Sequence, residues 1–200
     1  LIADKMPRHA QINRKTTETE ISLSLELDGA GNFEGSTGIG FLDHMLQLLT
    51  KHARLNLKVN ARGDLKVDDH HTVEDVGICL GTALREALGD KKGILRFGDS
   101  SVPMLESLAN VAIDLGGRPA LVYHSPLGHQ KIGDFDAGLV QEFLEALSTH
   151  AAMNLHVNVP YGSNTHHVAE AIFKALAQTL SKAVKVDERV KGVPSTKGVL

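Results

Sequence analysis

Two short stretches of the chain repeat one pattern of side chains that can bind metal. Residues 70–74 read HHTVE and residues 166–170 read HHVAE. In a helix, side chains three and four positions apart share a face, so Glu74 and Glu170 can each lie beside both histidines of their motif. Adjacent imidazoles point about 100° apart, so one pair could serve two different ions. Imidazole combined with carboxylate suits Mn, Fe, Zn or Ni better than Ca or Mg.

Two further histidines stand out because they break the similarity between the segments around these motifs. The first segment has His44 where the second has Glu142, and the second has His156 where the first has Lys58. The resulting pool of candidate ligands divides into two sites of four and consists of His44, His70, His71, Glu74, His156, His166, His167 and Glu170. Four protein ligands leave room for water or substrate on a six-coordinate ion.

A single HHxxE motif would be weak support for metal binding, because paired histidines also serve as polar residues at helix starts. The second copy, together with the two extra histidines, favours metal binding. By contrast, His52 and His150 align with each other near predicted helix ends. There they are expected to contact carbonyl groups or the helix dipole.

The motifs lie in two similar halves of the chain. LTKHARLNLKVN at 49–60 matches LSTHAAMNLHVN at 147–158, and the segments that begin with the two HHxxE motifs also match. The length difference between the copies falls between these blocks, where a loop accommodates it most easily. We predict a first α+β half at 1–92, a second at 93–185 and a C-terminal tail at 186–200 that closes over substrate.

The hydrophobic spacing predicts strands and helices in the same order in each half. Segment 18–28 alternates apolar and polar residues, which is typical of a half-buried strand. Segment 41–53 has the apolar spacing of a helix. The predicted strands are 18–28, 55–60, 110–115, 120–123 and 154–158, and the predicted helices are 41–53, 72–88, 139–152 and 166–185. This order suggests antiparallel or mixed sheets with helices on one face, which leaves the other face in need of a partner.

Composition excludes several classes of protein. The net charge of -3 gives no electrostatic reason to expect nucleic acid or an anionic membrane as the main partner. No apolar run approaches the roughly 20 residues of a membrane span. The single cysteine, Cys79, excludes an internal disulfide framework and fits a reducing compartment. We therefore expect a cytoplasmic protein, or a plastid one if the source is a plant. The first residue is not Met, so a processed start can hide a targeting segment.

Several motifs together resemble the imidazoleglycerol-phosphate dehydratases of histidine biosynthesis. They run nearly end to end: FLDHML at 41–46, DDHHTVED at 68–75, GILRFGDSSVPM at 93–104, LGGRP at 115–119, NTHHVAEAIFKALA at 164–177 and GVPSTKGVL at 192–200. The resemblance implies an α+β fold of the ribosomal S5 domain 2-like type. Its architecture would be an internally duplicated pair of four-stranded sheet and two-helix units, with the helices on one sheet face.

The resemblance also implies a lyase that converts imidazoleglycerol phosphate to imidazoleacetol phosphate. The enzyme would be a homo-oligomer of 24 subunits with two Mn²⁺ ions per active site, at subunit boundaries. The eight candidate ligands fall on the family's ligand positions. The family's phosphate-binding positions fall on Arg96, Arg118, Lys174, Ser195 and Lys197. Glu18 matches a substrate-contacting active-site glutamate.

The chemistry of this reaction agrees with such a site. A metal on a nitrogen of the substrate ring can stabilise the charge that develops when the neighbouring C–H bond breaks. A base must take that proton and an acid must help the hydroxyl leave. Glu18 and Glu170 are the candidates, although a carboxylate that binds metal is less free to move protons. Arg96, Arg118 and Lys174 suit a phosphate dianion.

Two positions depart from the family pattern, and two other functions stay open from the residues alone. Leu105 stands where an aspartate is expected after VPM, and Leu48 stands where a glutamine is expected. A two-metal phosphoesterase would favour bridging carboxylates, with its metals about 3.5–4 Å apart. A metal-storage shell would need neither the basic residues nor the Ser-Thr-Lys tail.

Overall fold

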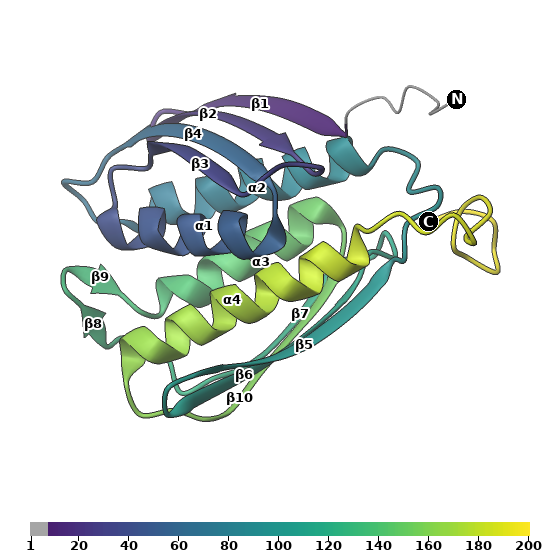
Figure 1. Ribbon diagram of the computed structural model, residues 1–200. Helices are drawn as coiled ribbons and strands as arrows, with labels where there is room; N and C mark the ends of the chain where they lie inside the picture. The colour runs from purple at the N-terminus through teal and green to yellow at the C-terminus, as the bar shows by residue number, and fades with distance from the viewer. Residues whose placement is uncertain (1–7) are drawn as a thin grey trace.

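The chain folds into two outer sheets with four helices between them (Figure 1). This computed structural model describes residues 8–200, so residues 1–7 of the predicted first half lie outside the described residues. The strands are β1 (His9–Lys15), β2 (Thr19–Glu26), β3 (Asn32–Ser36), β4 (Asn56–Gly63), β5 (Phe97–Met104), β6 (Ser107–Asp114), β7 (Ala120–His124), β8 (Lys131–Ile132), β9 (Phe135–Asp136) and β10 (Asn154–Tyr161). The helices are α1 (Gly40–Ala53), α2 (His70–Leu88), α3 (Leu139–Ala151) and α4 (Thr165–Ala183).

The two four-stranded sheets have the same topology. The first has the order β1-β2-β4-β3 and the second β5-β6-β10-β7. In each sheet one edge strand, β3 or β7, runs parallel to its neighbour, and the remaining pairs are antiparallel. The α+β class and the duplicated sheet and helix units are therefore confirmed. Hydrophobic spacing missed β1, β3 and β5, all edge strands, and the short β8–β9 hairpin.

Alternation along the strands determines which face of each sheet is buried. In β2, Ile21, Leu23 and Leu25 are at most 2% exposed, and the residues between them point outward. Helix α2 packs against β1 and β2, and α4 packs against β5 and β6. The helices then pair across the halves, α2 with α3 and α1 with α4. The central helical layer is thus covered on both sides, and the outer sheet faces remain open in a single chain.

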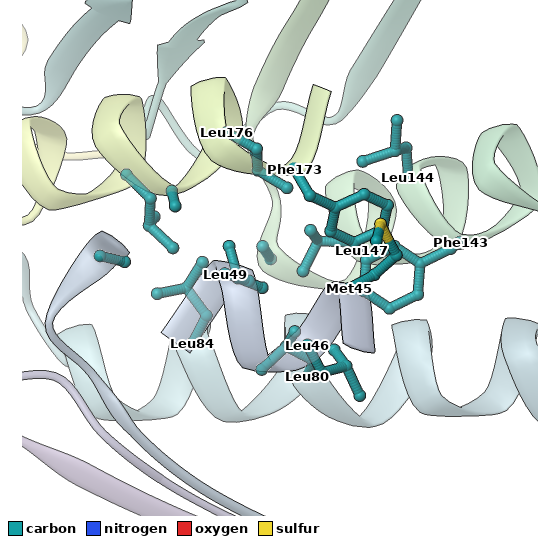
Figure 2. Packing of buried hydrophobic residues seen from close by; sticks show 14 of the residues in the cluster. Met45, Leu46, Leu49, Leu80, Leu84, Phe143, Leu144, Leu147, Phe173 and Leu176 are labelled. Carbon is teal, nitrogen blue, oxygen red and sulfur yellow. The ribbon is translucent and has the colours of Figure 1, made fainter. Parts of the chain in front are cut away.

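The hydrophobic core lies where the helices of the two halves meet. Figure 2 shows leucines of α1 and α2 facing the aromatic and leucine side chains of α3 and α4. The rings of Phe143 and Phe173 lie 5.5 Å apart, and both side chains are fully buried. Burying one such side chain stabilises the fold by about 1.5–3 kcal/mol. This interface therefore holds the two halves in one rigid arrangement.

Helices α2 and α3 approach so closely that α2 requires glycines at the contact. A Cβ at Gly77 would lie 2.8 Å from the Phe143 carbonyl oxygen, and one at Gly81 would lie 2.6 Å from that of Leu147. Both distances are shorter than van der Waals contact, so a side chain would push the helices apart. Near the end of α3, His150 Nδ1 lies 2.9 Å from the Ala146 carbonyl oxygen, as expected for a histidine at a helix end. Among residues 8–200, no helix combines the length and apolar character needed to cross a membrane.

Candidate metal and substrate site

Both HHxxE motifs open a long helix. Helix α2 begins at His70, whose amide donates to Asp68 Oδ1 at 2.8 Å. At the start of α4, the Asn164 side chain accepts hydrogen bonds from the amides of His166 and His167. These caps satisfy helix-end amides and fix where the helix starts. The imidazoles therefore stand at the first turn, and the motif glutamate stands one turn further along.

Three candidate ligands from two helices converge in one group. His44 from α1 places Nε2 3.0 Å from Glu170 Oε1, and His166 from α4 places Nε2 3.1 Å from the same oxygen. Ligand atoms of these three residues lie within 4.8 Å of one another, the one such group found within residues 8–200. Imidazole nitrogens and a carboxylate oxygen at this spacing fit a transition-metal ion.

Lys174 lies beside this group and keeps its carboxylate ionised. Its Nζ donates to Glu170 Oε2 at 2.6 Å, one helical turn away. Burial raises the pKa of Glu170, but the hydrogen bonds from Lys174 and the two imidazoles outweigh it and lower the pKa to about 2. The carboxylate is thus ready to accept a cation. Lys174 brings one candidate phosphate donor to the same place.

The corresponding group in the first half is looser. His70 Nε2 lies 3.9 Å from Glu74 Oε2, and His71 Nε2 lies 3.8 Å from Glu18 Oε1. His70 also lines a pocket of about 460 Å³ together with Asp69 and Glu142. Glu142 occupies the position in α3 that His44 occupies in α1. The two halves therefore place similar side chains at similar positions, although the first half forms pairs where the second forms a triad.

The second histidine of each motif meets a carboxylate that the sequence did not identify as part of the site. His71 Nδ1 lies 3.0 Å from Asp64 Oδ2, and His167 Nδ1 lies 2.8 Å from Glu106 Oε2. The hydrogen bond from His167, with that from the Asn164 amide, lowers the pKa of Glu106 to about 2. Glu106 lies in the turn between β5 and β6, as Glu18 lies in the turn between β1 and β2. Aligning these two hairpins would have pointed to Glu106.

His156 lies apart from the other candidate ligands within one chain. It is exposed on the outer face of the second sheet and lines a pocket of about 460 Å³ with His124, Asp99 and Asn110. A metal bound there would need donors from another chain if it is also to use the residues at the helix starts.

Most of the candidate phosphate donors gather at the opposite end of α4 from the His44 group. The Arg96 amide donates to the Ala183 carbonyl oxygen, at the last turn of α4. Its guanidinium binds both carboxylate oxygens of Asp114 at 2.6 and 3.0 Å, and Nη1 donates to the Pro194 carbonyl oxygen at 2.9 Å. Figure 1 shows the tail beyond the C-terminal end of α4. Ser195 and Lys197 therefore belong to this end.

The Gly116-Gly117 turn brings Arg118 to the same end. A Cβ at Gly117 would lie 2.9 Å from the Leu200 carbonyl carbon, so the tail folds back over this turn. Arg118 follows directly and is exposed. The five predicted phosphate-binding residues thus lie in two places. Lys174 is at the His44 group, and the others are at the far end of α4: Arg96, Arg118, Ser195 and Lys197.

Comparison with known proteins identifies the family. A profile of the imidazoleglycerol-phosphate dehydratases matches residues 37–180. A protein of that name from Geobacillus sp. (strain WCH70) is 58% identical over 195 residues, which cover 98% of this chain and 100% of the relative. The chain belongs to the imidazoleglycerol-phosphate dehydratase family. Another such dehydratase, from Geobacter metallireducens, is 57% identical with the same coverage of both chains.

Solved structures of dehydratases in this family share the fold. That of the enzyme from Staphylococcus aureus subsp. aureus N315 is 40% identical, with a TM-score of 0.81 over 90% of this chain and 99% of that one. That of the Pyrococcus furiosus enzyme in complex with (S)-C348 is 33% identical, with a TM-score of 0.81 over 94% and 100% of the two chains. The chain is therefore a lyase that dehydrates a small phosphate substrate in histidine biosynthesis.

Proposed function

We propose that the chain converts imidazoleglycerol phosphate to imidazoleacetol phosphate at a site that holds two Mn²⁺ ions. The observation that carries the two-metal site is the convergence of His44, His166 and Glu170, with its looser counterpart in the other half. When bound, the metal would act as a Lewis acid on the substrate's imidazole. The metal-binding positions would be His44, His70, His71, Glu74, His156, His166, His167 and Glu170.

Proton transfer falls to carboxylates that can reach substrate. Glu18 is exposed, lies on a turn and has His71 as its neighbour at 3.8 Å. We assign it the transfer of the proton from carbon. Glu170 is held by two imidazoles and Lys174. Its role is therefore to bind metal, with proton transfer only as a secondary task. Phosphate would be held by Arg96, Arg118, Lys174, Ser195 and Lys197.

We further propose that each active site combines residues of different chains. From Glu170 to Ala183, α4 rises about 20 Å, at about 1.5 Å per residue. A ring, a three-carbon chain and a phosphate span only roughly 10 Å with bonds of about 1.5 Å. One substrate molecule cannot touch the His44 group and the tail of the same chain. A closed homo-oligomer, for which 24 subunits is our expectation, would supply the missing side.

The pocket beside His70 suggests which residue completes the metal-binding group of the first half. Glu142 shares a pocket with His70 in one chain, and it stands where His44 stands in the other half. We propose Glu142 as a ligand on the His70 side. His156 remains a candidate only where another chain faces the outer sheet surface.

The tail would close over the phosphate. Its backbone is held by the hydrogen bond from the Gly93 amide to the Gly192 carbonyl oxygen at 2.9 Å, whereas the backbone hydrogen bonds that the amides of Ser195 and Gly198 donate stay within the tail, to Val193 and Ser195. Ser195 and Lys197 can each donate to phosphate oxygens. Deleting residues 194–200 should raise KM and lower kcat while leaving metal content unchanged. Nucleic acid and membrane are not expected as partners, and the cytoplasm is the expected location.

The deciding experiment is a dehydratase assay with imidazoleglycerol phosphate on protein stripped of metal and reconstituted with Mn²⁺. We expect turnover only in the reconstituted protein, and loss of turnover in His166→Ala. Release of inorganic phosphate in place of the dehydrated product would indicate a phosphoesterase. Metal uptake with neither product would indicate a storage protein, and either result would overturn the proposal.

A further inference from the structure

The second histidine of each HHxxE motif is held in a defined tautomer by a carboxylate outside the motif. His71 Nδ1 lies 3.0 Å from Asp64 Oδ2 and 3.2 Å from Oδ1. His167 Nδ1 lies 2.8 Å from Glu106 Oε2. Because an ionised carboxylate only accepts hydrogen bonds, the neutral form of each ring carries its proton on Nδ1. The lone pair then lies on Nε2.

We propose that Asp64 and Glu106 are positioning residues that fix His71 and His167 with Nε2 presented for metal coordination. The inference rests on the two-metal site proposed above. A carboxylate that holds the remote N–H of a ligating imidazole fixes the ring orientation and makes the imidazole a better donor. Each carboxylate acts through its histidine and does not touch substrate.

The two halves reach this arrangement with residues from unrelated places. Asp64 follows β4 in the loop that leads to α2, whereas Glu106 lies in the β5–β6 turn. No internal repeat explains two carboxylates at the same ring nitrogen from different loops. The coincidence is therefore better explained by a shared requirement of the imidazole than by duplicated structure.

Glu18 and Glu106 show why the ring nitrogen matters. They lie in equivalent hairpin turns, yet Glu18 approaches His71 at Nε2 and Glu106 approaches His167 at Nδ1. Glu106 also accepts hydrogen bonds from the Asn164 amide at 2.9 Å and from the Ser107 hydroxyl at 3.0 Å, so its carboxylate is fixed in place. No side-chain hydrogen bond to the Glu18 carboxylate is found within residues 8–200. Glu18 is thus available for proton transfer, and Glu106 is assigned to orientation.

The test measures tautomers and metal affinity separately from catalysis. Imidazole ¹⁵N shifts of the metal-free protein should show His71 and His167 protonated on Nδ1 at a pH where they are neutral. Asp64→Ala should move His71 toward the Nε2-protonated form, and Glu106→Leu should do the same for His167. Mn²⁺ dissociation constants from calorimetry should rise roughly 10–100-fold in either variant.

Two further variants distinguish orientation from general damage. Glu106→Gln keeps an acceptor for His167 and should retain the wild-type tautomer, with a smaller loss of affinity than Glu106→Leu. Glu34→Gln removes an exposed carboxylate that pairs with Lys58 and should change neither the histidine tautomers nor the Mn²⁺ affinity. Wild-type tautomers together with wild-type Mn²⁺ affinity in Asp64→Ala and Glu106→Leu would overturn the inference. Absence of dehydratase activity in the wild type would overturn the proposed function but leave the tautomer result standing.

Discussion

A particle assembled from two different impaired variants should regain dehydratase activity. One variant is His166→Ala, which removes a member of the His44 group. The other lacks residues 194–200 and so has neither Ser195 nor Lys197. These two parts of one chain lie at opposite ends of α4, about 20 Å apart by the helical rise, which is about twice the length of the substrate. If each site takes them from different chains, mixing can rebuild intact sites.

The expected recovery follows from how chains combine. In a random one-to-one mixture, half of the sites receive an intact metal group and, independently, half receive an intact tail. About a quarter of the sites are then fully wild type in a symmetric assembly of such chains. Alone, the tail variant should lose at least one charged hydrogen bond worth about 1.5–3 kcal/mol. That is a loss of roughly 10–100-fold in kcat/KM, so activity must be measured at low substrate concentration.

The assay uses two affinity tags. The variants are co-expressed, particles that carry both tags are isolated in two steps, and kcat/KM is compared with that of each variant alone. The matched control mixes His166→Ala with Glu170→Ala. Both residues belong to one group within one chain, so no combination of chains can rebuild it. Doubly tagged particles that have wild-type size but no recovered activity would show that the tail and the metal group act within the same chain.

Three other predictions concern individual residues. In the presence of chelator, the free energy of unfolding should fall as pH drops from about 5 toward 2. The cause is that Glu170 has a folded pKa of about 2 against an ordinary value of 4.5, so its ionised form stabilises the fold. Denaturant titrations should show a weaker fall in Glu170→Gln. Gly81→Ala should destabilise the fold by about 1–3 kcal/mol in urea, because its Cβ would lie 2.6 Å from the Leu147 carbonyl oxygen, whereas Gly40→Ala has open space and should change little. Burial raises the pKa of the Cys79 thiol to about 11, so iodoacetamide at pH 8 should leave it unmodified in native protein and modify it in guanidinium, as mass spectrometry would show.

The sequence predicted the elements whose buried positions carry large apolar side chains, and it missed edge strands whose buried positions do not: β5, for example, buries Gly98 and Ser100. The alternation in β2 and the helical spacing of α1 are strong because one side of each element packs against the core. Strand β3 reads NFEGS and none of its residues is fully buried. It is held by backbone hydrogen bonds to β4, and such bonds leave no trace in the pattern of side chains. The resemblance to a family supplied the four-stranded units that hydrophobic spacing could not.

For the site, the motifs predicted which side chains could serve as metal donors but not which of them meet in space. The spacing of HHxxE correctly placed Glu170 beside His166, because both lie on one helix face. The contact of His44 with Glu170 joins residues 126 positions apart and depends on how α1 packs against α4. No pattern within one segment contains that information. The same holds for Asp64 and Glu106, since a turn residue meets a helix-start imidazole only after both hairpin and helix are in place.

The duplicated motif has diverged in a way that makes its two copies unequal. Where α4 carries Lys174, the aligned position of α2 is Ile78. Glu170 is therefore neutralised by a lysine before any metal binds. Among residues 8–200, Glu74 pairs only with His70, and it is more exposed than Glu170. If both motifs served identical sites, the aligned position of α2 would also be expected to carry a phosphate donor. The asymmetry instead fits one composite site in which the α4 copy provides metal ligands together with a cation for the substrate. In the proposed site, the α2 copy would provide metal ligands together with the exposed carboxylate of Glu18, beside His71.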